Sequence, residues 1–323
     1  MASKKTSVFT KVSTAWKNGA RFSKRYALYR FGERVASSVR LKRLSKRYRE
    51  KKDSYIIGYL ENRISTVVKS FEGLDYKGDF SDNAPIWVCW WSGIDTAPKI
   101  VRRCVESIIA NSDGRKVNLI NKNNYSDYID VPIYILKKLE TGQMKTAHFA
   151  DYLRVCLLEK YGGLWLDATL FCSQTIPKLY FDTPVFTMKS EYSDTVFIAK
   201  NQWSTFCLGG FCGNVFYSFL RCAFEAYWQE EDYPVDYLFF DYLIYIAVRR
   251  IPAVKRYMDE IELNNTHWNS LSAAFNAALP ARELDGVLYG DTVFYKLSWK
   301  KGYPLTSFEG TPSVYARFVD GEA

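Results

Sequence analysis

The stretch T-A-H-F-A-D-Y-L-R-V-C-L-L-E-K-Y-G-G-L-W-L-D-A-T, residues Thr146–Thr169, decides the fold. Its first part carries apolar side chains at helical spacing, and Thr146 is a candidate N-cap. Gly162-Gly163 can adopt the left-handed conformation that ends a helix. A short apolar strand, residues 164–166, follows at once. Because ligands of open α/β sheets bind beyond the carboxyl ends of the strands, we expect Asp167, at the end of this strand, to face a ligand.

Two charged residues of the predicted helix, Asp151 and Arg154, are three positions apart and so share one face. A carboxylate can accept hydrogen bonds from sugar hydroxyls, and a guanidinium can form paired hydrogen bonds with phosphate oxygens. The alternative is an ordinary exposed ion pair, which would contribute only about 0.3–0.5 kcal/mol. Taken alone, the pair favours this alternative. Asp167, at the end of the next strand, is more suggestive of a site, because a carboxylate after an apolar run usually faces a ligand or a helix N-terminus.

Short apolar runs alternate with amphipathic segments along much of the chain, which is typical of a parallel sheet with crossover helices. The glycine-rich segment 207–214 lacks the spacing of a phosphate loop, so a nucleoside triphosphatase is a poor interpretation. We expect this segment to be a loop that lines the site, on the side where a second substrate would bind. The other predicted elements are strands at 85–91 and 116–120, helices at 99–111, 215–228 and 237–248, and a β-hairpin of 184–189 with 195–199.

The composition narrows the class of protein. A chain of 323 residues that is 48% hydrophobic can bury a large core. Seven cysteines without a C-x-x-C pair favour reduced thiols over a disulfide framework, and two histidines exclude a histidine-rich metal site. Aromatic residues reach 17%, which fits either sugar-stacking surfaces or a core rich in Tyr and Phe. No segment has the roughly 18 uninterrupted apolar residues that span a bilayer.

The basic charge is concentrated at the N-terminus. Residues 1–52 hold 17 of the 44 Lys and Arg but only 2 of the 35 Asp and Glu, so the rest of the chain is mildly acidic. We expect a further helix at 54–71 and a linker at 72–83, which divides the chain into an N-terminal extension, 1–83, and a catalytic domain, 84–323. The basic, aromatic-rich arm fits an anionic lipid surface, with nucleic-acid binding or a solvated tail as alternatives.

The central stretch resembles the nucleotide-sugar site of a glycosyltransferase family with a GT-A fold. That family includes bacterial capsular polysaccharide synthesis proteins, fungal mannosyltransferases and the glucosylating domains of clostridial toxins. Its pattern is a helix with A-x-x-S/A-D-x-x-R, then Y-G-G-hydrophobic-aromatic-hydrophobic-D-x-D. The matching residues are Ala147, Ala150, Asp151, Arg154, Tyr161, Gly162, Gly163, Trp165 and Asp167. Thr169 replaces the last Asp of the pattern, and this D-A-T form resembles the capsular branch.

Three other segments resemble the same branch: I-W-V-C-W-W-S-G at 86–93, D-Y-L-F-F-D-Y-L at 236–243 and Y-K-L-S-W-K at 295–300. The resemblance therefore covers about residues 84–300. It implies an α/β fold of the GT-A type, in which a Rossmann-like, mostly parallel sheet is flanked by helices. A basic helical N-terminal extension precedes this domain.

The resemblance also implies a function. It indicates a retaining glycosyltransferase that transfers a hexose from a nucleotide sugar, most simply a UDP-linked one, to a lipid-linked oligosaccharide in capsular or surface polysaccharide biosynthesis. Such an enzyme would lie on the cytoplasmic face of the inner membrane, held by the N-terminal basic segment, and would bind no nucleic acid. Two alternatives stay open: a glycosyltransferase that modifies proteins, and a non-catalytic member of a polysaccharide assembly complex.

The implied site residues come from three parts of the chain. Asp151, Arg154 and Asp167 are the implied catalytic residues. Mn²⁺ or Mg²⁺ would bind Asp167 and Thr169, although the neutral Thr169 hydroxyl is a weak ligand. His267 is a further candidate near the C-terminus, and either Asp236 or Asp241 could contact the acceptor, although a capping or buried hydrogen-bonded role fits both better. The implied donor-binding residues are Trp87, Val88, Asp151, Arg154, Trp165, Asp167, Thr169, Ser298, Trp299 and Lys300.

Overall fold

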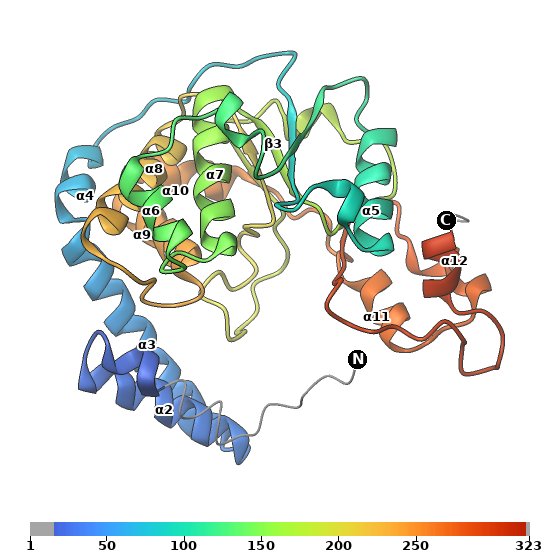
Figure 1. Cartoon of the computed structure of the whole chain (residues 1–323), viewed down its shortest axis with the longest axis horizontal. Coiled ribbons are helices and arrows are strands. Elements are labelled where there is room, and N and C mark those ends of the chain that lie inside the picture. Colours follow the sequence, from blue (N-terminus) through green and yellow to red (C-terminus); the bar gives the residue numbers. More distant parts are fainter. Residues whose placement is uncertain (1–15, 321–323) are drawn as a thin grey trace.

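The structure is a computed structural model that describes residues 16–320 (Figure 1). Its strands are β1 (Ile86–Cys89), β2 (Val117–Ile120), β3 (Gly163–Asp167), β4 (Leu170–Cys172), β5 (Val185–Thr187), β6 (Cys207–Gly210) and β7 (Phe294–Lys296). Its longer helices are α2 (Lys24–Ser38), α3 (Lys42–Arg63), α4 (Ser65–Phe71), α5 (Lys99–Ala110), α6 (Ile133–Glu140), α7 (Thr146–Tyr161), α8 (Val215–Glu230), α9 (Phe239–Arg250), α10 (Pro252–Glu260), α11 (Ser270–Asn276) and α12 (Val314–Asp320).

The main sheet has the strand order β2-β1-β3-β6-β5. Strands β2, β1 and β3 run parallel, whereas β6 runs antiparallel to β3 and β5 antiparallel to β6. Cys89 at the end of β1 pairs with Asp167 at the end of β3, so the carboxyl ends of these strands meet at one edge. A second, two-stranded sheet pairs β4 with β7 in antiparallel register. This mixed, mostly parallel arrangement confirms the predicted α/β fold.

Alternate residues of the strands supply two hydrophobic cores. Trp87 and Trp165 face the layer of α7, α8, α9 and α10, whereas Val88 and Leu166 face the layer of α5, α11 and α12. Figure 1 shows these two groups of helices on opposite sides of β3. The predicted strand at 85–91 is confirmed as β1, Ile86–Cys89, and the structure shows that it is buried on both faces.

The junction of α7 and β3 has the predicted glycine geometry. Gly162 has φ +64° and Gly163 has φ +92°, and a Cβ at Gly163 would lie 2.1 Å from the carbonyl oxygen of Pro85. The helix thus turns directly into the strand beside β1. The predicted N-cap was wrong, because Lys145 occupies the cap position and Thr146 is the first helical residue. The carbonyl of Lys145 accepts the first hydrogen bond of the helix, from the N–H of Phe149.

The predicted hairpin of 184–189 with 195–199 was wrong. Strand β5 does form, but its partner is β6, in the glycine-rich segment that we expected to be a loop. Glycine is needed in β6 because the neighbouring backbones approach closely: a Cβ at Gly210 would lie 2.2 Å from the carbonyl oxygen of Pro184. Residues 195–199 form no strand.

The N-terminal extension is helical, as predicted, from Lys24 onward. Its first part, residues 1–15, lies outside the described residues. The helix expected at 54–71 is in fact two helices, α3 and α4, and α3 already begins at Lys42. Tyr26, Ile56 and Leu60 belong to the same core as α7, α8 and α9, so the extension packs on the rest of the chain. The division at residue 84 stays a prediction.

Candidate active site

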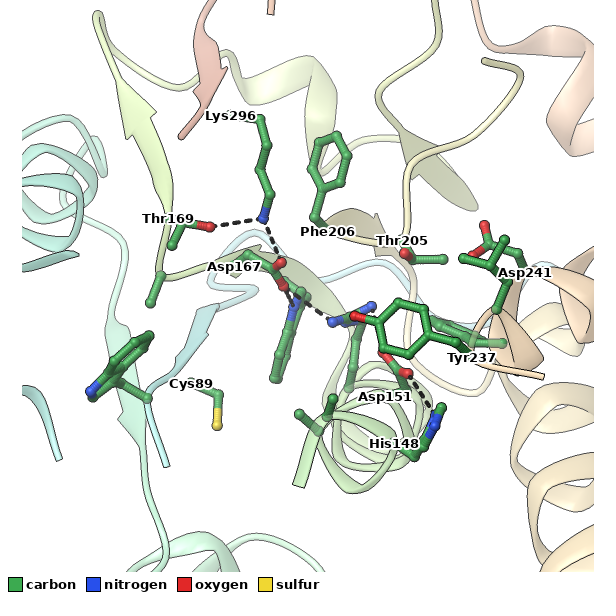
Figure 2. A pocket seen from close by; sticks show the side chains of 18 of the residues that line it. Cys89, His148, Asp151, Asp167, Thr169, Thr205, Phe206, Tyr237, Asp241 and Lys296 are labelled. Carbon is green, nitrogen blue, oxygen red and sulfur yellow. Dashed lines mark hydrogen bonds and ion pairs between the residues drawn. The ribbon is translucent and has the colours of Figure 1, made fainter. Parts of the chain in front are cut away.

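A cleft of about 390 Å³ opens at the carboxyl ends of β1 and β3 (Figure 2). It lies between the start of α7, the end of β3, the start of α9 and the strand β7. Its lining residues are Cys89, Trp90, Ala147, His148, Ala150, Asp151, Arg154, Trp165, Asp167, Ala168, Thr169, Thr205, Phe206, Tyr237, Leu238, Phe240, Asp241, Lys296 and Trp299.

Arg154 connects the helix α7 to the end of β3. Its side chain is only 5% exposed, and its Nη2 donates to Asp167 Oδ1 over 3.1 Å. Its Nη1 lies 3.3 Å from Asp151 Oδ1, and its guanidinium lies over the Trp165 ring, 4.8 Å from the centroid. A guanidinium can hold two carboxylates at once because its donors form a rigid, planar fork. The arrangement is a buried charge cluster and not the exposed ion pair that Asp151 and Arg154 alone would suggest.

Lys296 approaches the same carboxylate from the opposite wall of the cleft (Figure 2). Its Nζ donates to Asp167 Oδ2 over 2.7 Å and to Thr169 Oγ1 over 2.8 Å. Asp167 Oδ1 also accepts from the indole N–H of Trp165 over 3.1 Å. Both oxygens of Asp167 therefore accept hydrogen bonds from neighbouring side chains.

The three carboxyl groups of the cleft have different proton affinities. Burial raises the pKa of Asp151 to about 7, although Arg154 opposes this effect. Burial also raises the pKa of Asp241 to about 6, against the hydrogen bond from Trp203. Burial would raise the pKa of Asp167 as well, but Lys296 and Arg154 outweigh it and hold that pKa below its usual value. Asp167 is thus the carboxyl group of the cleft that loses its proton at the lowest pH.

Several buried donors of the cleft lack a hydrogen-bond partner among residues 16–320. They are Trp90 Nε1 and Arg154 Nε. Arg154 Nη1 and His148 Nδ1 also make no hydrogen bond within these residues, but each faces an oxygen of Asp151, at 3.3 Å and 3.8 Å. Burial lowers the pKa of His148 to about 4, so its imidazole is neutral although Asp151 Oδ2 lies 3.8 Å away. Buried polar groups in native proteins are normally hydrogen-bonded, so donors gathered around one cleft indicate a place for a polar ligand.

Comparison with protein families agrees with this geometry. A model of the capsular polysaccharide synthesis protein family matches residues 37–315. The chain belongs to this family. The match begins in α2 and ends in α12, so it extends further at both ends than the resemblance visible in the sequence at about 84–300. No curated protein and no solved structure matches the chain significantly.

The structure of this capsular polysaccharide synthesis protein brings most of the predicted site residues together. Those that line the cleft are Asp151, Arg154, Trp165, Asp167, Thr169 and Trp299. Asp241 also lines it, and its Oδ1 accepts from Trp203 Nε1 over 3.0 Å.

Other predicted site residues lie elsewhere. Trp87 is only 2% exposed, and its indole N–H donates to the carbonyl of Gly162 over 3.0 Å, so its side chain belongs to the core. Val88 is buried in the middle of β1, on the other face of the sheet. Neither residue lines the cleft.

Of the candidate site residues near the C-terminus, only some line the cleft. Of the closing segment, Trp299 lines the cleft, whereas Ser298 and Lys300 do not. His267 lies outside the cleft too, where it stacks on Tyr289. Asp236 accepts a hydrogen bond from the backbone N–H of Leu238 and pairs with Arg30, so it has the structural role that we favoured.

The side chains around Asp167 do not fit the divalent cation that the resemblance implies. Residues 16–320 contain no group of three or more His, Cys, Asp or Glu that could hold a metal ion. The two implied ligands, Asp167 and Thr169, both accept hydrogen bonds from the ammonium of Lys296. Mg²⁺ and Mn²⁺ bind oxygen ligands with free lone pairs, and a cation here would meet the charge of Lys296.

Lys296 is the site residue that the sequence analysis missed. It lies in the closing segment Y-K-L-S-W-K, where the resemblance implied Ser298, Trp299 and Lys300 instead. The usable signal is a single charge in the apolar run Val293–Leu297. Its partners could not be inferred, because they depend on the pairing of β7 with β4, which sets Lys296 opposite Leu170, next to Thr169. The rim residues Phe206 and Tyr237 come from loops. Phe206 carried no pattern, whereas Tyr237 lies in the segment 236–243, of which only Asp236 and Asp241 were considered.

Proposed function

We propose that this protein is a retaining glycosyltransferase that transfers a hexose from a nucleotide sugar, most simply a UDP-hexose, to a lipid-linked oligosaccharide in capsule assembly. The observation that carries the proposal is the cluster of Asp151, Arg154 and Asp167 in one cleft, with unpartnered donors around it. Membership of the capsular polysaccharide synthesis family supports the biosynthetic context.

The cleft residues can divide the recognition of a donor between them. Arg154 has one buried nitrogen, Nε, without a hydrogen bond within residues 16–320, and its Nη1 makes only the ion pair with Asp151, so the guanidinium suits a phosphate oxygen or a sugar hydroxyl. Asp151, whose pKa is near neutrality, can accept from or donate to hydroxyls. Trp90 and Trp299 meet edge to face at 5.6 Å between centroids and line the same wall, where an aromatic surface can stack on a base or a sugar.

Retention of configuration requires that the acceptor attack from the face that the diphosphate leaves. The bond from the anomeric carbon to the diphosphate oxygen breaks with its electron pair on that oxygen. The acceptor oxygen then bonds to the anomeric carbon and its proton passes to the departing diphosphate. This route uses no separate protein base, and the chain's part is to stabilise charge on the diphosphate.

A second hollow beside the cleft is the acceptor site that we propose. This hollow, of about 520 Å³, shares Thr205, Phe206, Leu238 and Asp241 with the cleft. Two further indoles, Trp203 and Trp268, line this second hollow and can stack on sugar rings. Asp241, at the boundary, suits an acceptor hydroxyl. The arrangement supports an oligosaccharide acceptor rather than a small hydroxyl compound.

The N-terminal helices support attachment to a lipid surface. None of the helices within residues 16–320 is long and apolar enough to cross a membrane. Helix α2 exposes Leu28, Phe31 and Val35 at helical spacing, among the many cations of α2 and α3. Exposed apolar side chains flanked by Lys and Arg are typical of helices that lie on anionic lipid. A third hollow, lined by Arg30 and Arg34 of α2, shares Phe197 and Leu238 with the second hollow, in which we place the acceptor. The basic helices therefore adjoin the proposed acceptor site.

The enzyme assay measures UDP release from a panel of UDP-sugars by purified protein, wild type beside Asp167→Asn. We expect slow hydrolysis of one donor by the wild type and a loss of about 100-fold or more in the variant. The matched control is Asp82→Asn, because Asp82 is exposed and lies outside the cleft. Equal rates in wild type and Asp167→Asn would contradict the site. No turnover of any donor would favour the non-catalytic alternative.

The lipid proposal has its own test. Wild type should sediment with vesicles that contain anionic lipid at low salt, and Phe31→Ser should weaken this binding. Phe308→Ser is the matched control, because Phe308 is also exposed but lies near the C-terminus. Equal binding of all three proteins would show that α2 does not form the contact.

A further inference from the structure

Lys296 is held in place by its backbone as well as by its side chain. Its own N–H donates to the carbonyl of Trp268 over 2.8 Å, and the N–H of the next residue, Leu297, donates to the carbonyl of Thr169 over 2.9 Å. Strand β7 is thereby fixed on both sides. The Lys296 side chain is 22% exposed and lines the cleft, so its ammonium is reachable by a ligand.

We propose that the ammonium of Lys296 supplies the positive charge that stabilises the leaving diphosphate, in place of a divalent cation. This inference rests on the proposed glycosyl transfer. The proposal is based on the position of Lys296 Nζ, which donates hydrogen bonds to Asp167 and Thr169, the first and third residues of the D-A-T motif. These are the two positions that were expected to hold the metal.

The hydrogen-bond capacity of the ammonium fits this role. A lysine ammonium has three N–H donors, and two of them go to Asp167 and Thr169. The third is available to a phosphate oxygen in the cleft. Asp167 and Thr169 are then positioning residues that orient the ammonium. The neutral hydroxyl at position 169 fits this role, because a second carboxylate there would cancel the positive charge that stabilises the diphosphate.

The charge balance at this end of the cleft points the same way. Asp167 is one anion held between two cations, Lys296 and Arg154. Because Asp167 is shared between both cations, it neutralises the charge of Lys296 only in part, and Arg154 has Asp151 as a second partner. When the bond between the anomeric carbon and the diphosphate oxygen breaks, the electron pair stays on that oxygen, and the acceptor's proton passes to the diphosphate. Lys296 donates a hydrogen bond throughout and loses no proton.

The experiment compares UDP release with EDTA and with Mn²⁺, using the donor that the panel identifies. Wild type should turn over equally in both conditions. Lys296→Ala should lose about 100-fold or more. Lys296→Arg should recover part of the rate, because it keeps a cation. Lys301→Ala, an exposed lysine nearby, is the matched control and should behave as wild type. Thermal unfolding checks that every variant is folded.

A double variant separates this role from a merely structural one. Thr169→Asp with Lys296→Ala recreates two carboxylates and removes the ammonium, so we expect turnover that depends on Mn²⁺ and exceeds that of Lys296→Ala alone. Wild-type turnover that EDTA abolishes and Mn²⁺ restores would overturn the proposal while leaving the glycosyltransferase intact. So would a folded Lys296→Ala with the wild-type rate. A wild type without turnover in either condition would instead remove the proposed function, and this inference with it.

Discussion

The two walls of the cleft are built in different ways. The α7–β3 wall, which carries Asp151, Arg154 and Asp167, comes from one continuous stretch of chain. The β7 wall, which carries Lys296 and Trp299, comes from the C-terminal part and reaches the site by pairing with β4. Side chains of the first wall are largely buried, whereas Trp299 is 44% exposed. A local motif thus sets the charge cluster, and a distant strand completes it.

The largest expected effect concerns the α7–β3 wall. Arg154→Lys keeps a positive charge but cannot hold Asp151 and Asp167 together, because an ammonium lacks the planar fork of the guanidinium. We expect the rate of UDP release to fall about 100-fold or more while the protein stays folded. Arg282→Lys is the control, since Arg282 forms an exposed pair with Glu309. If the rate fell only a few-fold, the site would need a positive charge at position 154 but not the planar geometry of the guanidinium.

The same contrast explains what the sequence could predict. Residues 146–169 specify a helix, a glycine turn and a strand through contacts between near neighbours, so spacing predicted where Asp151, Arg154 and Asp167 lie on these elements. Their joint role was implied by the resemblance. Lys296 lies 129 residues beyond Asp167, and its hydrogen bond depends on strand pairing that no local pattern encodes. Trp87 was misplaced for a related reason: a strand buried on both faces does not show which face holds the ligand.

Strand β6 shows a further limit of local patterns. Consecutive glycines normally indicate a loop, because glycine has the largest conformational entropy to lose. Here Gly209 and Gly210 lie in a strand between β3 and β5, where the neighbouring backbones leave no room for a Cβ. The crowding comes from Gly163 and Pro184, on other segments, so only the assembled sheet reveals why the glycines are needed.

A smaller effect should appear in stability. Asp241 has its pKa raised from 3.8 to about 6 by burial, so the folded state binds its proton more tightly than the unfolded state. The free energy of unfolding therefore falls as pH rises from about 4 to about 6. Asp241→Asn can still accept from Trp203 and removes this loss, so it should be more stable than wild type at pH 8, by about 1–2 kcal/mol, and nearly equal at pH 4.

Urea unfolding at both pH values measures this difference. Asp285→Asn is the control, because the side chain of Asp285 is exposed. A variant that is stabilised equally at pH 4 and pH 8 would show that the gain does not come from the proton of Asp241.

The smallest effect is expected at the β7 wall. Trp299→Ala removes an exposed ring that meets Trp90 edge to face, and such aromatic contacts contribute about 0.5–1.5 kcal/mol. We expect KM for the donor to rise about 3–10-fold with little change in kcat, because the ring binds without touching the reacting atoms. Phe308→Ala is the control for loss of an exposed ring. A fall in kcat at constant KM would place Trp299 in the transfer step itself.

The packing of α2 and α3 has a consequence for how such an enzyme would meet its substrate. Tyr26 is completely buried and donates to the carbonyl of Val235, and Arg30 pairs with Asp236, immediately before the cleft residue Tyr237. A bilayer that holds these helices would hold the cleft at one fixed height. A lipid-linked acceptor would then have to extend from the bilayer to the hollow beside Asp241, so the number of its sugars would decide whether it reaches the site.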